Sequence, residues 1–473
     1  MLFNSFEFAV FFPVVTALYF ALPHRFRWAM LLAASCVFYM AFIPAYLLIL
    51  LFTITVDYFA GLGIDAATGR WRKVLLYVSL CANALILAVF KYFNFLNETL
   101  RSLAQPLGAH YEVPNLSLIL PIGLSFHTFQ SLSYVIEVYR GRFRAEKHFG
   151  LFALYVMFYP QLVAGPIERP QNLLPQFRVT HQFDYSRVTD GLRLMAWGLL
   201  LKVVVADNLA PAVDMVYGDV RHYAGFPLAA ATVLFAFQIY CDFHAYSLIA
   251  IGTARVMGFS LMTNFRQPYL SSSIAEFWRR WHVSLSTWFR DYLYIPLGGN
   301  RVSSWRWLRN LLIVFAVSGL WHGANWTYVI WGLLHGTYIA VSAWTQALRQ
   351  RTVQAMGMGR WPVVLRTARI ACTFFFVSFA WIFFRARTLT DAWYVITHIP
   401  LASRGAERLE VPVIALLGMV VVLVTDWLEQ REPVPAIVSR QPLVPRWAVY
   451  YAVVLTILVW GNFGSREFIY FQF

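Results

Sequence analysis

The chain has 473 residues, of which 59% are hydrophobic and only 13% are charged. An ordinary soluble domain is about 45–50% apolar and about 25% charged, so this composition excludes a soluble protein and predicts an integral membrane protein. The formal net charge of +15 does not indicate a nucleic-acid partner, because the basic residues form short clusters between apolar runs, near 24–27, 70–73, 140–144 and 349–351. Short basic loops tend to remain cytoplasmic and to set orientation. An alternative is that some of these loops bind an anionic cytoplasmic donor, such as a nucleotide-bearing thioester.

Apolar runs of roughly 15–25 residues, long enough to cross a bilayer as helices, recur along the chain. A backbone in lipid must satisfy its own hydrogen bonds, so we expect each run to be helical. The sequence therefore predicts an all-α, multi-pass protein with about ten to twelve spans, a retained first span at 8–22 and a single domain over 1–473. The runs lie near 7–23, 28–43, 46–62, 74–94, 117–138, 149–165, 188–206, 226–242, 309–345 (two spans), 364–384, 411–427 and 447–462.

The stretch 264–304 interrupts this pattern with too many polar groups for a lipid-facing span. Irregular backbone at membrane depth is tolerated only where it is buried in protein or lines a water-filled cavity. We predict one or two short helices here, re-entrant or interfacial, followed by a loop. The charged and histidine side chains of the stretch are Arg266, Glu276, Arg279, Arg280, His282, Arg290, Asp291 and Arg301.

On one continuous helix, Arg279, His282, Ser286 and Arg290 fall at i, i+3, i+7 and i+11, close to a single face. Such a polar face is expected to line a central funnel or tunnel. The alternative is an amphipathic interfacial helix whose arginines reach the headgroups.

His322 is a second histidine in apolar sequence, within Ser318-Gly-Leu-Trp-His-Gly-Ala-Asn-Trp326. Ionisable residues inside membrane-like sequence are costly to bury and indicate a functional site, and histidine suits proton transfer near neutral pH. Gly319 and Gly323 permit close approach of a backbone or a substrate. The alternative is a histidine satisfied by a neighbouring helix. His335, further along, is expected to be a packing or supporting residue.

Other common chemistries leave no trace in the sequence. The four cysteines are scattered singly through apolar segments, which predicts neither a disulfide framework nor a metal site. We find no zinc-protease, Walker or dinucleotide-binding motif. We therefore expect no bound metal and no bound cofactor.

Several separate blocks resemble the membrane-bound O-acyltransferases, specifically the type formed by the membrane subunit of alginate O-acetyltransferase. The resemblance extends from Met1-Leu-Phe-Asn-Ser to the last residue, and the long block at 276–301 is its most specific part. The other blocks are Pro121–Tyr134, Phe158–Arg169, Gln238–Phe243, Trp321–Gly323 and Glu467–Phe473.

The resemblance implies that His322 is the essential catalytic residue and that His282 is the upstream polar member of the catalytic pair. It also implies a multi-pass fold in the bacterial inner membrane and an acetyl thioester donor such as acetyl-CoA. The acetyl group would cross the membrane to a periplasmic or membrane-anchored partner transferase of the SGNH type, which would belong to a polysaccharide biosynthesis complex. Residues expected to bind substrate or to support the pair are Arg279, Trp281, Ser286, Arg290, Asp291, Trp321 and Asn325.

One block departs from the family pattern, where Asp242-Phe-His-Ala-Tyr-Ser-Leu248 replaces the usual Ser-Gly pair by His244-Ala245 and a second acid by Leu248. The acceptor therefore stays open: an alginate-like exopolysaccharide, or another envelope acceptor such as peptidoglycan, cellulose, teichoic acid, a lipid or a protein. A transporter is the alternative outside the family. Lys202, within an apolar run, would suit an ion path or would extend towards the membrane surface.

Overall fold

The computed structural model describes residues 1–405, 409–464 and 468–469. These residues group into two compact units, a first unit of 1–195 with 249–262 and a second unit of 196–248 with 263–473. Each unit is a region of dense internal contacts. The single domain expected over 1–473 stays a prediction. Of the terminal block at 467–473, only Phe468 and Ile469 lie within the described residues.

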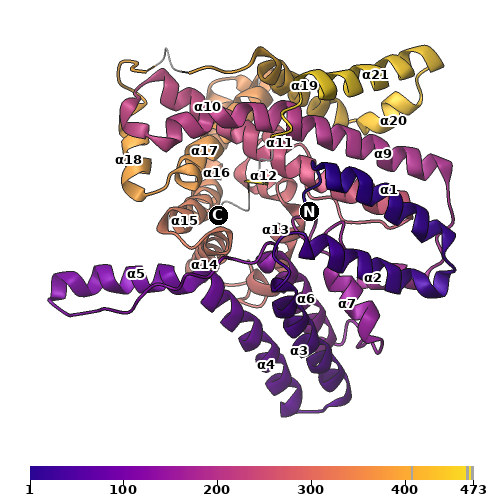
Figure 1. Ribbon diagram of the computed structural model, residues 1–473. Coiled ribbons are helices and arrows are strands. Elements are labelled where there is room, and N and C mark those ends of the chain that lie inside the picture. Colours follow the sequence, from indigo (N-terminus) through magenta and orange to yellow (C-terminus); the bar gives the residue numbers. More distant parts are fainter. Residues whose placement is uncertain (406–408, 465–467, 470–473) are drawn as a thin grey trace. The chain divides into compact units, whose positions relative to one another are not determined.

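The prediction of an all-helical protein is confirmed, because the described residues form helices joined by turns and one isolated bridge between Ala224 and Arg404 (Figure 1). The first unit holds α1 (Phe6–Ala21), α2 (His24–Met40), α3 (Tyr46–Ala66), α4 (Arg70–Leu87), α5 (Phe93–Ala104), α6 (Leu124–Tyr139), α7 (Phe149–Met157) and α8 (Pro170–Leu173). Two helices contribute residues to both units, α9 (Tyr185–Leu200) and α11 (Phe226–Met257). The second unit holds α10 (Asp207–Gly218), α12 (Ile274–Arg280), α13 (Val283–Phe289), α14 (Ser304–His322), α15 (Trp326–Trp344), α16 (Gln346–Ala355), α17 (Pro362–Arg385), α18 (Leu389–His398), α19 (Val413–Glu429), α20 (Val434–Ser439) and α21 (Leu443–Trp460).

Within the described residues, five helical segments are long and apolar enough to cross a membrane: 46–66, 70–107, 226–257, 362–385 and 443–460. This number is smaller than the ten to twelve spans predicted from apolar runs. The main reason is length, since α1, α2 and α6 have 16, 17 and 16 residues. A helix needs about 20 residues to cross the hydrocarbon core without help.

The prediction of a span at 149–165 is wrong. Helix α7 ends at Met157, and the chain continues in turns through Ala164. Phe158, Leu162 and Ala164 are nevertheless buried inside the first unit. The run is apolar because protein surrounds it, which length and hydropathy cannot distinguish from burial in lipid.

Helices α3, α4 and α6 of the first unit surround a buried carboxylate. Asp57 of α3 accepts hydrogen bonds from Ser79 Oγ over 2.6 Å and from Asn83 Nδ2 over 3.0 and 3.1 Å, both on α4. Ser131 Oγ of α6 donates to its second oxygen. A buried charge is tolerated when its lone pairs are occupied in this way, so the network joins the three helices.

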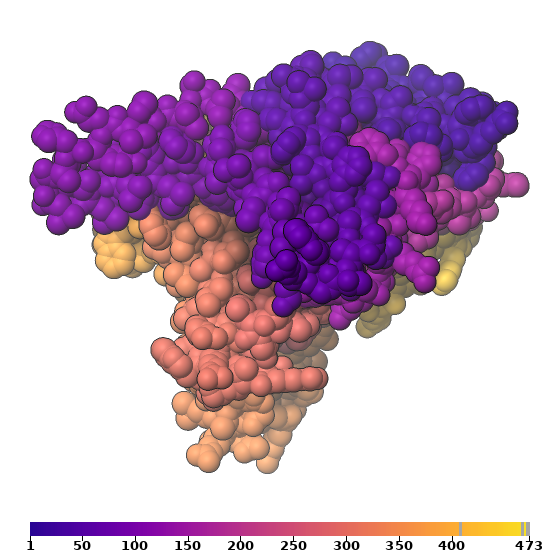
Figure 2. All heavy atoms as spheres, turned by 90° about the horizontal axis from the view of Figure 1, so that it is seen from below, coloured from indigo at the N-terminus to yellow at the C-terminus, as the bar shows by residue number. Residues whose placement is uncertain are grey.

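A π-helical turn at Ala88–Tyr92 separates α4 from α5. Beyond it, α5 extends away from α3 and α6, as Figure 1 shows and as the purple segment at one edge of Figure 2 also shows. Its polar side bonds to the returning chain, since Asn94 Nδ2 donates to Leu116 O over 2.9 Å and Asn97 Nδ2 donates to Val113 O over 3.0 Å. These bonds fold residues 109–119 back along α5.

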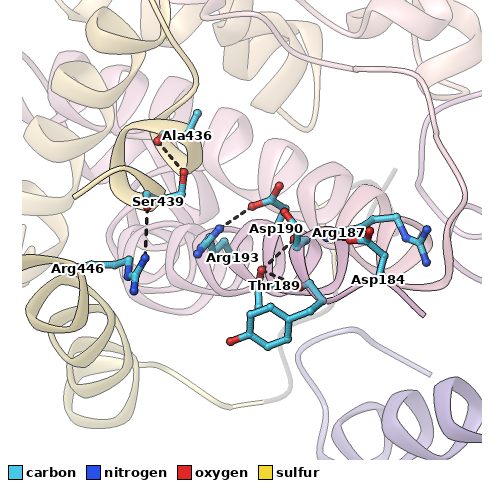
Figure 3. A network of polar contacts seen from close by, with 10 residues as sticks. Asp184, Arg187, Thr189, Asp190, Arg193, Ala436, Ser439 and Arg446 are labelled. Atoms are coloured by element: carbon cyan, nitrogen blue, oxygen red, sulfur yellow. Dashed lines mark hydrogen bonds and ion pairs between the residues drawn. The ribbon is translucent and has the colours of Figure 1, made fainter. Parts of the chain in front are cut away.

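Polar contacts fix the start of α9 within the first unit (Figure 3). Asp184 Oδ1 accepts a hydrogen bond from the backbone N–H of Arg187 over 2.6 Å, the usual way in which an aspartate caps a helix. One turn later, Arg193 pairs with Asp190 over 2.6 Å. Figure 3 also draws a bond within the second unit, from Arg446 Nη1 to Ser439 O over 3.4 Å, which joins α21 to the end of α20.

Helices α14 and α15 of the second unit pack backbone against backbone. A Cβ atom at Gly319 would collide with the carbonyl of Tyr328, and one at Gly332 would collide with the carbonyl of Phe315. Glycine at both crossings lets the two helices approach closely. The sequence predicted that Gly319 allows close approach of a backbone or a substrate, and it is the backbone of α15 that lies against it. The packing of α14 on α15 sets the position of His322 at the end of α14.

Lys202 does not extend to the membrane surface as the sequence suggested. Its ammonium lies 2.9 Å from Asp207 Oδ1 and 2.9 Å from Asp242 Oδ1, and all three side chains are buried in the second unit. Asp242 also accepts a hydrogen bond from the backbone N–H of Ile469 over 2.8 Å. The lysine is therefore the centre of a buried ion triad, a contact that spacing in the sequence does not show.

Candidate functional site

His322 lies in the last turn of α14 and is 3% exposed. Aromatic rings of three helices surround its imidazole. The ring centroids lie 4.9 Å from Trp321, 5.0 Å from Trp331 on α15 and 5.5 Å from Phe384 on α17, each at a steep angle. α14 ends here because Gly323 adopts an extended backbone and Asn325 caps the next helix. The region 309–345, predicted to form two spans, forms the two helices α14 and α15, although neither is among the five segments that are long and apolar enough to cross a membrane. Their junction presents His322 to the interior.

His282 is completely buried and connects two short helices, α12 and α13, each of seven residues. Its backbone is left-handed, with φ 44° and ψ 54°, a conformation that costs a non-glycine residue about 1–2 kcal/mol. The imidazole packs edge-on against Phe243, with ring centroids 4.6 Å apart. The prediction of short helices in the stretch 264–304 is thus confirmed, and the turn between them carries the histidine.

The two histidines lie together inside the second unit, with their ring centroids 6.5 Å apart. Trp321 is 6.0 Å from His282 and so contacts both rings. The sequence separates the pair by two helices and a loop, and only the fold makes them neighbours.

Asn264 contacts both His282 and the start of α13. Its Oδ1 lies 3.0 Å from His282 Nδ1 and accepts from Ser284 Oγ over 2.9 Å. Its backbone carbonyl accepts from the N–H of Val283 over 2.9 Å, and its Nδ2 donates to Ser247 Oγ over 3.0 Å. This fully buried asparagine was not singled out by the sequence, because it lies 18 positions from His282 and no local period connects them.

Trp281 was expected near the site. It belongs to a group of packed aromatic rings, here called the aromatic wall, made up of Phe277, Trp281, Trp321, Trp331, Trp381 and Phe384. Its ring stacks on Phe277 with centroids 5.4 Å apart and contacts Trp381 of α17 at 5.2 Å. Trp381 in turn stacks on Trp331 at 5.7 Å, and Trp331 contacts His322. Trp331, Trp381 and Phe384 were missed because an aromatic stripe at helical spacing looks the same whether it lines a site or fills a core.

The prediction that Arg279, His282, Ser286 and Arg290 share a helical face is wrong. α12 ends at Arg280, and the left-handed backbone at His282 turns the chain before α13 begins. Arg279 and Arg290 are exposed, whereas His282 is buried.

The other polar residues of this stretch have local partners. Ser286 Oγ donates to Trp281 O over 3.1 Å, and Arg290 pairs with the adjacent Asp291 over 2.8 Å. Their expected contact with substrate stays a prediction, as does a central tunnel.

Asn325 uses its amide to organise the chain next to His322. Its Oδ1 accepts from the N–H of Thr327 over 3.0 Å, which caps α15, and its Nδ2 donates to Arg387 O over 3.0 Å. Both ends of the amide are thus engaged in local structure. A contact with substrate, expected from the sequence, stays a prediction.

Several buried polar atoms of Trp331, which contacts His322, and of the rings packed on it have no hydrogen-bond partner among the described residues. These are Nε1 of Trp331, Nε1 of Trp381 and both ring nitrogens of His335. His335 lies 5.1 Å from Trp331 and stacks on Phe277 at 6.0 Å, so it packs within the aromatic wall as the sequence suggested. An unpaired buried polar group costs about 1–3 kcal/mol, and such groups gather where water or a ligand completes them.

His244, the main departure from the family pattern, is buried on α11 and stacks on Tyr240 with ring centroids 5.3 Å apart. Tyr240 donates to both carboxylate oxygens of Asp426 on α19, at 3.0 Å each. The departure thus belongs to a buried polar group of the second unit that does not include His322.

The described residues contain no cluster of three or more side chains able to hold a metal ion, and all four cysteines are free. The site therefore consists of two buried imidazoles, an asparagine that orients one of them and an aromatic wall. Such an arrangement can move a proton in surroundings from which bulk water is excluded.

Comparison with known proteins finds two kinds of similarity. The model of the MBOAT family, the membrane-bound O-acyltransferase family, matches residues 146–385. Probable alginate O-acetylase AlgI of Pseudomonas aeruginosa is 40% identical over 401 residues, which cover 83% of this chain and 74% of that protein. The probable alginate O-acetylase AlgI of Pseudomonas putida is 34% identical over 501 residues, covering all of both chains.

A relative with another acceptor in its name is also similar. Peptidoglycan O-acetyltransferase of Helicobacter pylori is 34% identical over 394 residues, which cover 77% of this chain and 72% of that protein. The matched family region, 146–385, includes His282, His322 and the aromatic wall.

Proposed function

Since this chain belongs to the membrane-bound O-acyltransferase family and is therefore a multi-pass membrane O-acyltransferase, we propose that it transfers an acetyl group in the O-acetylation of an alginate-like exopolysaccharide. The observation that carries the proposal is the buried pair of His282 and His322, 6.5 Å apart within the matched region. The named function of the relatives that are 34–40% identical supports the acceptor class.

The chemistry is acyl transfer from a thioester to a hydroxyl group. His322 takes the proton of the attacking hydroxyl as its oxygen forms a bond to the carbonyl carbon. The tetrahedral oxyanion then collapses, the carbon–sulfur bond breaks, and the thiolate receives the proton. A positioned general base of this kind supplies about 10²–10⁴-fold in rate. His282 either donates to the oxyanion or accepts a hydrogen bond from the acceptor substrate.

The aromatic wall suits a small acyl group. Trp321, Trp331 and Phe384 enclose the imidazole of His322 at 4.9–5.5 Å between ring centroids. Enclosure excludes the water that would otherwise hydrolyse the donor. The unpaired Nε1–H groups of Trp331 and Trp381 are donors available to a carbonyl or to an ordered water.

The donor in this proposal is a cytoplasmic acetyl thioester such as acetyl-CoA, and the protein lies in the bacterial inner membrane. The acetyl group passes to a periplasmic or membrane-anchored transferase of the SGNH type, within a polysaccharide biosynthesis complex. The described loops between helices are too short to form a polysaccharide-binding domain, which supports the proposal of a separate partner.

The test is polymer-bound O-acetyl in cells that carry the wild type, His322→Ala or His322→Gln, with the membrane level of each protein measured. We expect loss of acetyl ester at equal protein level in both variants, because neither side chain can take a proton. The glutamine variant separates loss of the base from a cavity left by alanine. Normal acetylation in a well-expressed variant overturns the catalytic assignment.

Peptidoglycan is the second candidate acceptor, favoured by the 34% identity to the Helicobacter pylori enzyme. The same cells discriminate between the two, because base-labile acetate is measured separately in purified exopolysaccharide and in purified peptidoglycan. Loss of acetate from the peptidoglycan alone in His322→Ala would assign the enzyme to that polymer.

A further inference from the structure

The side-chain amide of Asn264 is oriented by a group that can only donate. The backbone N–H of Ser284 is directed at Asn264 Oδ1 over 3.4 Å. A main-chain nitrogen is never an acceptor, so the atom opposite it has to be the amide oxygen. The amide nitrogen then faces Ser247 Oγ, which accepts from it over 3.0 Å. Both ends of the amide agree on one orientation.

This orientation decides which nitrogen of His282 bears the proton. Nδ1 lies 3.0 Å from the same Asn264 Oδ1, and an amide oxygen only accepts. Nδ1 therefore carries the hydrogen. In a neutral imidazole the other nitrogen, Nε2, is then an acceptor.

The backbone keeps the ring in place for this bond. His282 adopts a left-handed conformation, and the N–H of Val283, the next residue, donates to the carbonyl of Asn264 over 2.9 Å. Strain of this kind persists only where the surroundings over-determine it and gathers at functional sites. One buried residue thus fixes His282 through both its backbone and its side chain.

We propose that Asn264 is a positioning residue that holds His282 as the Nδ1–H tautomer, so that His282 accepts a hydrogen bond from the acceptor substrate through Nε2. A neutral His282 in this tautomer does not donate to the oxyanion, so of the two roles open to it only the acceptor role is left. The proposal rests on the acyl transfer proposed above.

The test compares Asn264→Ala, Asn264→Asp and the control Ser284→Ala in membranes that carry the full chain and its acceptor system, with thiol release from acetyl-CoA followed against pH. Asn264→Ala removes the acceptor for Nδ1–H and is expected to lower kcat about 10- to 100-fold, by analogy with the loss of hydrogen-bond partners that orient metal-bound histidines. Ser284→Ala removes another donor to the same oxygen and is expected to retain wild-type turnover.

Asn264→Asp keeps an acceptor at Nδ1 and adds a negative charge. It is expected to recover turnover relative to alanine and to move the acidic limb of the kcat profile to higher pH by about one pH unit or more, because a nearby carboxylate favours the imidazolium. A residue with a merely structural role would not shift that limb.

A spectroscopic readout is independent of activity. In protein labelled with ¹⁵N-histidine, the His282 signals are identified by their loss in His282→Gln, and their shifts distinguish Nδ1–H from Nε2–H. An Nε2–H signal in the wild type, or an Asn264→Ala variant with wild-type kcat and pH profile, overturns the proposal and leaves the acyl transfer intact. Wild-type membranes without transfer from acetyl-CoA overturn the proposed function itself, whatever tautomer the spectrum shows.

Discussion

Two buried polar regions of the molecule are built in opposite ways. Around Asp57 in the first unit, three side chains donate to the carboxylate and both of its oxygens are occupied. In the second unit, Nε1 of Trp331, which contacts His322, and both ring nitrogens of His335, which contacts Trp331, have no hydrogen-bond partner among the described residues. A buried carboxylate whose oxygens are bonded by protein groups is stabilised by the fold itself, whereas buried donors and acceptors without a protein partner can be completed by water or a ligand. The first arrangement joins helices, and the second can bind a small polar group.

The strongest test of this comparison is to disrupt the buried ion triad of Lys202, Asp207 and Asp242 in the second unit. Lys202→Met leaves Asp207 and Asp242 buried without their cation and is expected to lower the free energy of unfolding by about 3–5 kcal/mol. Thermal unfolding in detergent and the amount of protein in the membrane measure the loss. Lys202→Arg, which keeps the charge, is the matched control, and an unchanged unfolding temperature in the methionine variant would contradict the structural role.

The Asp57 network offers a milder test. Asp57→Ala leaves Ser79, Asn83 and Ser131 without their acceptor and is expected to cost about 1–3 kcal/mol of stability. Acetyl transfer per folded molecule is expected to remain at the wild-type level. Asp57→Asn retains one acceptor oxygen and serves as the control. Loss of transfer in a stable, normally expressed Asp57→Ala protein would place this network in the reaction and end the distinction between the two regions.

The smallest effect is expected at Arg290, whose guanidinium is exposed and pairs with Asp291. Exposed ion pairs contribute about 0–1 kcal/mol, so Arg290→Ala is expected to change neither stability nor transfer measurably. Thermal unfolding in detergent and acetyl transfer per folded molecule check this expectation. A marked fall in transfer would show that the arginine contacts a substrate, as the sequence suggested, and would extend the site beyond the buried region.

Much of this architecture follows from the sequence, because apolar runs of span length have little choice but to form helices. The sequence also singles out His282 and His322 as histidines in apolar surroundings, and both are buried in the structure; their catalytic role stays a prediction. Prediction from the sequence fails where the result depends on whether protein or lipid surrounds a segment. The run 149–165 reads as a span, but its second half is irregular chain enclosed by protein.

The partners of the histidines are the part that local patterns do not reach. Asn264 meets His282 across 18 positions, and Lys202 meets Asp242 across 40 positions of chain, neither of which a helical or strand period predicts. The extrapolation of one helical face from Arg279 to Arg290 failed for the same reason. It assumed regular backbone through His282, where the structure has a left-handed turn.

That left-handed turn has a consequence for selection. Glycine adopts this conformation more readily than histidine, so the backbone at position 282 disfavours histidine relative to glycine by about 1–2 kcal/mol. A screen of position 282 that rewards thermostability alone is therefore expected to enrich residues that relax the turn, while a screen that rewards transfer retains the imidazole. Selection for stability and selection for activity would thus favour different residues at position 282, which is the trade-off typical of catalytic residues.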